Sequence, residues 1–202
     1  MIDLLKYERE MQRLGKTVIA GMDEAGRGPL AGPVVTACVV MPLDKIIEGV
    51  NDSKKLSETK RERLYGQIME AALDITVKAV DHKVIDEINI LNAVKLGMEG
   101  CVATLQLKPD IVLIDAVKIK TEAETLSIIK GDALSYSIAA ASIVAKVTRD
   151  RMMREFDRQY PEYCFAKHKG YGTQLHIDKI RQNGLSEIHR RSFCKNFYEQ
   201  HD

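Results

Sequence analysis

Acidic side chains follow three short apolar segments of this sequence. They are Asp23 and Glu24 after VIAGM, Asp115 after IVLI, and Asp132 after SIIKG. A single Asp at a strand end is ordinary, because Asp is common in turns. Carboxylates held by buried strands at one sheet edge would instead have fixed positions, and they would repel one another unless a cation neutralised them. The pattern predicts a site for Mg²⁺ or Mn²⁺, which favour oxygen ligands.

This set of acids suits the hydrolysis of a phosphodiester. Two divalent ions about 3.5–4 Å apart support in-line attack, because one activates water and the other stabilises the leaving oxygen. The alternative interpretation is an acidic sheet edge exposed to solvent, which predicts no dependence on metal.

A glycine-rich turn begins just after the first two acids. Its residues are Gly26, Arg27 and Gly28. Glycines let backbone amides approach a sugar-phosphate closely, and an Arg side chain can bind a phosphate through two hydrogen bonds. Gly-Arg-Gly also occurs in plain turns, so its place beside the acids is what favours a binding role.

A predicted helix after Asp132 has a polar stripe. Ser135, Ser142, Lys146 and Arg149 return to nearly one face of that helix. One interpretation is a row of phosphate contacts leading to the metal site. The alternative is an ordinary helix face exposed to solvent.

Basic residues outside this helix form further candidate contacts. Lys54 and Lys55 precede a predicted helix, and the segment 167–173 places Tyr171 between glycines and close to cations. An exposed tyrosine without bulky neighbours can stack on a sugar or a base. Another basic patch lies at residues 189–191. Such charged runs are equally typical of a plain protein surface.

The elements that would hold these residues follow from hydrophobic periodicity. Strands are expected at residues 17–23, 34–41, 73–80, 111–115 and 126–129. Helices are expected up to residue 16, after a cap at Ser57 or Thr59, over 84–107, 133–159 and 173–183, and after a cap at Ser186. The short link between the first two strands predicts an antiparallel pair. The expected fold class is α/β, a mixed sheet flanked by helices with a small C-terminal helical region.

The composition is that of an ordinary globular chain. Its 202 residues fit one domain, and the 30 Lys and Arg nearly balance the 29 Asp and Glu, for a net charge of +1. Acids exceed bases before Lys146, and bases exceed acids from there on. No apolar run is long enough to cross a membrane, and the N-terminus lacks a secretory signal. Four Cys without a CxxC pair favour the reducing cytoplasm.

The motifs of the chain resemble bacterial ribonuclease HII, the type 2 ribonuclease H. They are, in family order, GMDEAGRGPLAGPVV, NDSKKLS, VLIDA, KGDALSYSIAAASIVAKVTRDR, HKGYGT and HRRSF. They extend from about Val18 to Phe193. The resemblance implies a ribonuclease H-like sheet in a single catalytic domain over residues 1–202. Residues from about 161 to 202 would form a helical substrate-binding appendage.

The resemblance also implies an activity. Members of this family are metal-dependent endonucleases that cleave the RNA strand of RNA–DNA hybrids. They also nick duplex DNA on the 5′ side of a single embedded ribonucleotide, leaving a 3′-hydroxyl and a 5′-phosphate. The implied cofactors are two Mn²⁺ or Mg²⁺ ions, and the implied partners are hybrids and ribonucleotide-containing DNA, with no membrane. We expect a cytoplasmic monomer.

The site residues of the family map onto this sequence by motif. The catalytic and metal-binding acids would be Asp23, Glu24, Asp115 and Asp132. The 2′-hydroxyl of the ribonucleotide before an RNA–DNA junction would be read by Gly26, Arg27 and Gly28, and the deoxyribose of the next nucleotide would stack on Tyr171. Phosphates would be bound, without reading of sequence, by Lys54, Lys55, Ser142, Lys146 and the C-terminal basic residues.

The roles of the four acids can be divided further as a hypothesis. We expect Asp23 to bridge both ions and Asp132 to lie on the side of the nucleophile. Glu24 and Asp115 would then lie on the side of the leaving group.

Three other functions are weighed against this one. The type 3 enzyme of the same superfamily carries an N-terminal substrate-binding domain, for which the roughly 16 residues before the first strand leave no room. A non-catalytic hybrid-binding module would need at least one broken carboxylate, and all four are present. A metal-dependent exonuclease would degrade from ends, which a circular substrate would reveal.

Overall fold

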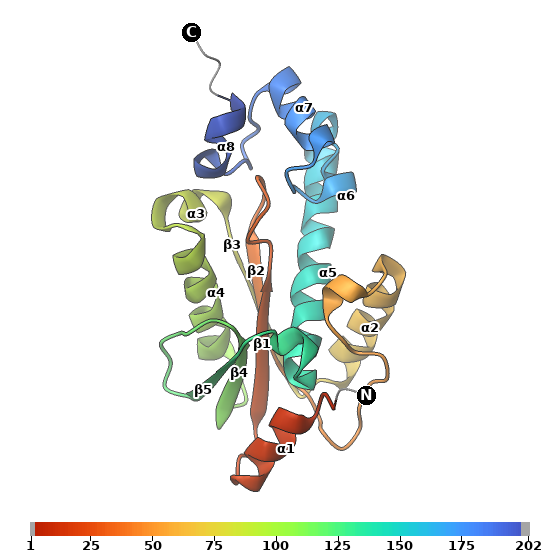
Figure 1. The fold of residues 1–202 in the computed structure, drawn as a ribbon, viewed down its shortest axis with the longest axis vertical. Coiled ribbons are helices and arrows are strands. Elements are labelled where there is room, and N and C mark those ends of the chain that lie inside the picture. The colour runs from red at the N-terminus through yellow and green to blue at the C-terminus, as the bar shows by residue number, and fades with distance from the viewer. Residues whose placement is uncertain (1–2, 199–202) are drawn as a thin grey trace.

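A mixed five-stranded sheet forms the centre of the protein. The structure, a computed structural model, describes residues 3–198. The strand order is β3-β2-β1-β4-β5 (Figure 1). The strands are β1 (Ile19–Ala25), β2 (Val34–Val40), β3 (Asp74–Val80), β4 (Ile111–Asp115) and β5 (Glu124–Ile128). The pairs β1–β2 and β2–β3 are antiparallel, whereas β1–β4 and β4–β5 are parallel. The predicted α/β class and the antiparallel first pair are confirmed.

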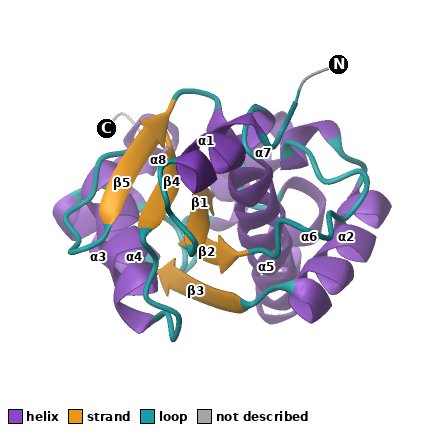
Figure 2. Cartoon of the chain, turned by 90° about the horizontal axis from the view of Figure 1, so that it is seen from below, coloured by secondary structure: helices purple, strands orange, loops and turns teal. Residues whose placement is uncertain are grey.

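Helices cover both faces of this sheet (Figure 2). They are α1 (Lys6–Arg13), α2 (Glu58–Ala71), α3 (His82–Ile88), α4 (Ile90–Thr104), α5 (Tyr136–Gln159), α6 (Phe165–His168), α7 (Gln174–Asn183) and α8 (Arg191–Tyr198). Three short 3₁₀ turns are η1 (Ser53–Lys55), η2 (Gly131–Ala133) and η3 (Pro161–Tyr163). The helices α5 and α2 pack on one face of β2, and α4 packs on the other.

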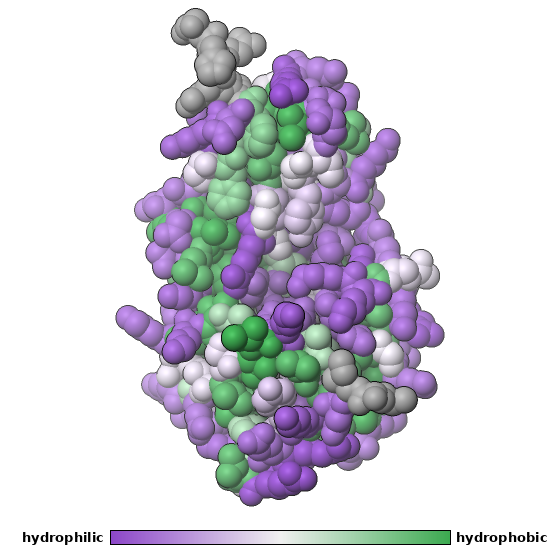
Figure 3. All heavy atoms as spheres, viewed as in Figure 1, coloured by the Kyte–Doolittle hydropathy of each residue, from purple (hydrophilic) through white to green (hydrophobic). Residues whose placement is uncertain are grey.

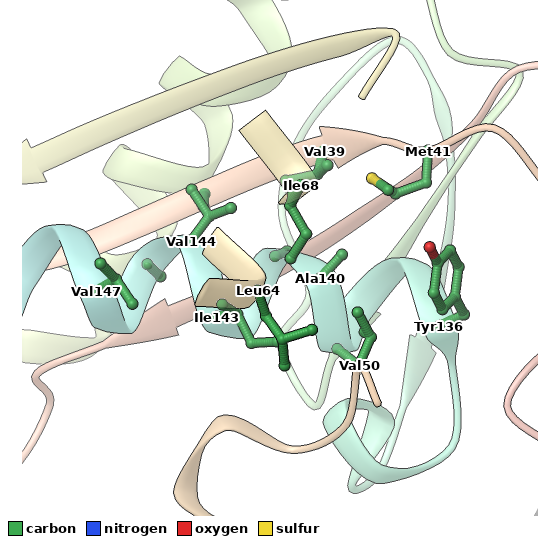
Figure 4. Packing of buried hydrophobic residues seen from close by; sticks show 14 of the residues in the cluster. Val39, Met41, Val50, Leu64, Ile68, Tyr136, Ala140, Ile143, Val144 and Val147 are labelled. Carbon is green, nitrogen blue, oxygen red and sulfur yellow. The ribbon is translucent and has the colours of Figure 1, made fainter. Parts of the chain in front are cut away.

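Strand alternation divides the core between these two faces. In β2, Val39 faces α5 and α2, where it packs with Leu64 and Ile143 (Figure 4). Its neighbour Cys38 faces α4 and packs with Met98. Because successive strand residues point to opposite faces, a strand buried on both sides reads as a continuous apolar run. Full burial of each such large apolar side chain stabilises the fold by about 1.5–3 kcal/mol.

The central strand β1 and the helix α5 approach each other through their backbones. A Cβ atom at Gly21 would lie 2.0 Å from the carbonyl carbon of Ser137, so only glycine permits this contact. The start of α5 is fixed by Ser135, whose hydroxyl accepts a hydrogen bond from Ile138 N at 3.2 Å. The buried carboxylate of Glu8 accepts the Ser137 N–H at 2.9 Å.

The elements after α5 gather at one end of the molecule, together with the loop between β1 and β2 (Figure 1). We call residues 26–33 the Gly-rich loop and residues 169–173 the Tyr171 loop. Leu30 N donates to Gly170 O at 2.8 Å, and Arg190 N donates to Leu30 O at 2.8 Å. The Gly-rich loop therefore lies between the Tyr171 loop and the segment that leads into α8.

Two predicted helices differ from the structure. The helix expected over 84–107 is two helices, because Asn89 adopts a positive φ of 66° and its side chain caps α4 by accepting from Asn92 N. The cap expected at Ser186 is wrong, since α8 begins only at Arg191 and the Ser186 hydroxyl is hydrogen-bonded to His189. The cap at Ser57 is confirmed. Residues 1 and 2, where the first predicted helix would start, lie outside the described residues.

The surface carries mixed polarity. On the face shown in Figure 3, hydrophilic residues surround separate apolar areas. Within residues 3–198, no helix combines the length and apolar character needed to cross a membrane. The four cysteines are free thiols, as predicted, and three of them are buried.

Candidate active site at the carboxyl ends of the strands

Three carboxylates meet where β1, β4 and β5 end. They are Asp23 of β1, Asp115 of β4 and Asp132 of η2, and one oxygen of each lies within 4.8 Å of the others. The parallel register that pairs Met22 with Ile114 makes Asp23 and Asp115 the next residues along the two strands. Asp132 joins them because η2 begins at Gly131, shortly after β5 ends at Ile128, and Gly131 N donates to Asp115 Oδ1 at 2.8 Å.

Burial makes this cluster costly in its ionised form. Burial raises the pKa of Asp23 well above its ordinary value, and the charges of Glu24 and Asp115 raise it further, whereas a hydrogen bond from Ser142 opposes the rise. The pKa of Asp115 is also raised, chiefly by burial. Like charges held together in a dry site favour a cation beside them. The oxygen donors and their combined negative charge fit a hard divalent metal ion.

A lysine already supplies one positive charge to the cluster. Lys54 Nζ donates to Asp132 Oδ2 at 3.1 Å. The lysine reaches the site from η1, whose first turn is capped by Asp52, since Lys54 N donates to Asp52 Oδ1 at 2.9 Å. The Lys54 side chain is 73% exposed, so it can move from the carboxylate to another anion without disturbing the core.

Glu24, the fourth predicted acid, does not join the three-carboxylate group. Alternation along β1 sends its side chain to the face opposite Asp23, and one of its oxygens forms an ion pair with Arg27. The other oxygen, Oε2, is buried and has no hydrogen-bond partner within residues 3–198. Burial raises the pKa of Glu24, and Arg27 opposes this rise. Glu24 therefore holds an unsatisfied acceptor beside the acid cluster.

The Gly-Arg-Gly turn has two glycines with different surroundings. Gly26 has a positive φ of 101°, and a Cβ atom there would lie 2.1 Å from Arg149 Nε. At Gly28, by contrast, a Cβ atom would meet nothing within 4 Å. The fold therefore requires glycine at 26 only, and the open space at Gly28 leaves its backbone accessible to a ligand. The Arg27 side chain is 43% exposed.

Tyr171 presents an exposed ring beside two cations. The residue is 40% exposed, and its ring centroid lies 5.8 Å from Lys146 Nζ and 5.7 Å from the guanidinium carbon of Arg149. Such distances fit cation–π contacts, which hold an aromatic ring in place. The ring is thus free on the surface yet supported from behind.

The four predicted phosphate contacts have different environments. Lys54 and Lys55 have exposed side chains. Lys146 is mostly buried and donates to Asp150 at 2.6 Å. Ser142 is buried between Asp23 and Ser53, whose hydroxyl lies 2.7 Å from its own. Sequence reasoning missed Ser53, although it lies in the NDSKKLS motif.

The polar stripe on α5 is not a surface. Ser135 and Arg149 are both fully buried. Both interpretations of the stripe, a face exposed to solvent and a row of phosphate contacts, are therefore wrong for these two residues. Arg190 is also fully buried, which corrects the basic patch at residues 189–191. These guanidiniums bind backbone carbonyls of the Gly-rich loop, which periodicity within one helix cannot reveal.

A cluster of buried histidines under the Tyr171 loop was also missed. His176 Nε2 lies 3.0 Å from His189 Nε2, and His176 Nδ1 lies 3.0 Å from the carbonyl oxygen of Tyr171. His168 stacks on His176 with ring centroids 4.2 Å apart. Burial lowers the pKa of His176 to about 4 and that of His189 to about 3. No sequence signal identified them, because their spacing matches no metal motif.

Comparisons with known proteins agree with this geometry. The family model described as Ribonuclease HII matches residues 20–196. The Ribonuclease HII of Acetivibrio thermocellus is 55% identical over 197 residues, which are 97% of this chain and 77% of that protein. The ribonuclease H2 of Pyrococcus horikoshii OT3 superimposes with a TM-score of 0.78 at 30% identity, over 91% of this chain and 98% of that one. The RNase HII in the PCNA complex from Archaeoglobus fulgidus superimposes with a TM-score of 0.73 at 28% identity, over 86% and 94%.

Proposed function

Because this chain belongs to the ribonuclease HII family and is a metal-dependent endonuclease that cleaves RNA in RNA–DNA hybrids, we propose how its residues divide that work. The observation that carries the proposal is the group of three carboxylate oxygens within 4.8 Å at the strand ends. Asp23, Asp115 and Asp132 would hold divalent metal, and Glu24, with its unpartnered buried oxygen, would complete the set.

The metal would be Mg²⁺ or Mn²⁺, bound as a pair of ions. Such ions supply an activated water and charge stabilisation at the leaving oxygen. Asp23 would contact both ions, because it is the most buried carboxylate of the cluster and has acids on two sides. Asp132 would serve the side of the nucleophile, and Glu24 and Asp115 the other side. Lys54 would release Asp132 and bind a substrate phosphate.

The substrate would be recognised by its sugars. We propose that the enzyme also nicks duplex DNA 5′ to a single ribonucleotide, leaving a 3′-hydroxyl and a 5′-phosphate. The 2′-hydroxyl is the group that distinguishes the target from DNA, and the open backbone around Gly28, with Gly26 and Arg27, would contact it. Tyr171 would stack on the next sugar, where a second 2′-hydroxyl would spoil the packing.

Phosphates would be bound by basic residues near these contacts. Lys54 and Lys55 present exposed cations for this purpose. Lys146 would contribute through its place behind Tyr171, and Ser142 would act by holding Asp23. The elements after residue 161 would form the substrate-binding appendage of a single-domain enzyme. A cytoplasmic monomer stays a prediction.

The test uses an end-labelled DNA duplex with one internal ribonucleotide, incubated with enzyme and Mg²⁺ or Mn²⁺. We expect a single nick 5′ to the ribonucleotide that EDTA abolishes. Asp23→Asn should lose the nick, whereas Asp44→Asn, a change at an exposed loop acid, should keep it. Cleavage of long hybrids alone would refute the roles of Arg27 and Tyr171, and cleavage from ends would indicate an exonuclease.

A further inference from the structure

Two arginine side chains are completely buried at the end of the molecule that carries Tyr171. Arg149 of α5 and Arg190 before α8 are each 0% exposed. Burial of a charged group costs free energy unless its donors are satisfied. Within residues 3–198, every hydrogen bond that these two guanidiniums make goes to a backbone carbonyl. The fold therefore uses two charged side chains to bind backbone rather than a carboxylate.

In the described part of the chain, the Arg190 guanidinium donates hydrogen bonds only to the Gly-rich loop. Its Nη2 donates to Gly26 O at 2.7 Å, its Nη1 to Arg27 O at 2.9 Å, and its Nε to Gly32 O at 2.9 Å. The guanidinium thus joins the beginning of the loop, including the Gly-Arg-Gly turn, to its end. A planar fork of donors suits this arrangement, and a lysine cannot reproduce it.

Arg149 binds two different segments. Its Nε donates to Pro33 O at 2.9 Å and its Nη2 to Ala31 O at 3.1 Å, both in the Gly-rich loop. Its Nη1 donates to Lys169 O at 2.9 Å, in the Tyr171 loop. The same guanidinium lies 5.7 Å from the centroid of the Tyr171 ring. Arg149 therefore joins the loop of the Gly-Arg-Gly turn to the loop and ring of Tyr171.

Backbone geometry leaves little freedom around these arginines. A Cβ atom at Gly170 would lie 2.6 Å from Ala31 O, so the two loops touch through their backbones. The Arg149 side chain packs against Gly26 so closely that a Cβ atom at this position would lie 2.1 Å from Arg149 Nε. Removal of the guanidinium would leave several buried carbonyls unpaired and open a space beneath both loops.

We propose that Arg149 is a positioning residue for substrate selection, which fixes the spacing between the Gly-Arg-Gly turn and Tyr171, and that Arg190 supports it by fixing the turn itself. This inference rests on the proposed function, in which the turn and Tyr171 contact neighbouring sugars. A single ribonucleotide in DNA engages both contacts at once. A continuous RNA strand engages the turn alone, because the nucleotide after the recognised ribose carries another 2′-hydroxyl at the position of Tyr171.

The test compares kcat/KM on two substrates of the same sequence, a DNA duplex with one ribonucleotide and an RNA–DNA hybrid. Arg149→Lys should lower kcat/KM on the single-ribonucleotide duplex by about 100-fold, the loss that a displacement of about 1 Å can cause, and should lower it far less on the hybrid. Arg190→Lys should lower kcat/KM on both substrates. Arg158→Lys is the matched control, since this residue lies on the same helix with a 76% exposed side chain.

A double-mutant cycle separates this inference from the proposed function. If Tyr171→Ala leaves the ratio of the two kcat/KM values unchanged, the proposed role of Tyr171 fails. Suppose instead that Tyr171→Ala lowers kcat/KM on the single-ribonucleotide duplex relative to the hybrid. Adding Tyr171→Ala to Arg149→Lys should then lower this ratio little further, because both changes remove the same sugar contact. Equal loss on both substrates in a folded Arg149→Lys protein overturns the inference.

Hydrogen exchange gives a second measurement that does not depend on activity. The amides of Leu30 and Gly32 should exchange faster in folded Arg149→Lys and Arg190→Lys, while those of β4 keep their protection. Unchanged exchange in the Gly-rich loop would contradict the positioning role. If neither variant folds, the two arginines serve the fold as a whole and the proposal is wrong.

Discussion

The contact between β1 and α5 makes Gly21 the most restrictive position next to the active site. In Gly21→Ala, the new methyl carbon would lie 2.0 Å from the Ser137 carbonyl carbon and 2.4 Å from Ile138 N. Both are backbone atoms, so no side-chain rotation relieves the clash. Since ordinary contacts begin near 3.4 Å, the helix and the strand must separate by about 1.4 Å.

This separation should be expensive and should reach the acids. We expect the free energy of unfolding to fall by about 3 kcal/mol or more, at the upper end of overpacked cores. Asp23 lies two residues further along the same strand face, so metal-dependent cleavage should fall as well. Urea unfolding in EDTA measures the first effect, and nicking of a single-ribonucleotide duplex measures the second.

Gly66→Ala is the matched control for Gly21→Ala. Gly66 lies inside α2, and a Cβ atom there meets nothing within 4 Å. The same substitution should therefore stabilise the protein by about 0.5–1 kcal/mol, because alanine favours helix. A Gly21→Ala protein within about 1 kcal/mol of wild type would refute the argument, since that is the cost of an average point substitution.

Three further predictions concern charge, metal and substrate. The pKa values of His176 and His189 lie below those of the unfolded chain, so the unfolded state binds more protons as the pH falls. Stability should decrease by about 2 kcal/mol for each histidine, about 4 kcal/mol together, between pH 7 and pH 5. His189→Gln should remove about half of this dependence in urea unfolding, and a profile with the same slope as wild type would contradict it. Lys54→Met removes the cation that is paired with Asp132. In the absence of substrate, calorimetry should therefore show Mn²⁺ binding that is tighter by up to about 5-fold. Weaker binding would show that the lysine supports the metal site. Gly28→Ala should leave the melting temperature unchanged, because the new Cβ atom meets open space. The value of kcat/KM should fall at least about 10-fold, because the methyl group blocks the approach of the substrate ribose. Full activity would show that the ribose binds elsewhere.

The acid cluster could be predicted because each of its acids directly follows a short apolar segment, which is a signal within a few neighbouring residues. Asp23, Asp115 and Asp132 each follow a short apolar run, and parallel pairing of β1 with β4 brings the first two together. Glu24 was assigned to the same cluster, and its side chain leaves β1 on the other face and pairs with Arg27, yet it stays close enough that, beyond the effect of burial, the charge of Asp115 raises its pKa. The difference between these neighbours is one of side-chain direction, which a motif does not carry.

The function of α5 could not be predicted in full for a related reason. Helical periodicity placed Ser142 and Arg149 on one face, but it cannot tell which part of that face another segment covers. Arg149 is covered by residues 31–33 and 169, whose carbonyls it binds. These segments lie far from α5 in the sequence, so the periodicity of the helix carries no sign of them. The break at Asn89 was missed because a positive φ at one asparagine interrupts an otherwise continuous apolar spacing.

The Gly-rich loop depends on partners that are synthesised much later. Gly26 receives its hydrogen bond from Arg190, 164 residues further along the chain. On a ribosome, the three segments that bear the clustered acids, β1, β4 and η2, emerge before the segment that fixes this loop. Contacts of such sequence separation form late and slow the completion of folding. In the proposed function, the acids would therefore be synthesised before the segment that holds the substrate-contacting turn, and selectivity would be the last property that the nascent enzyme acquires.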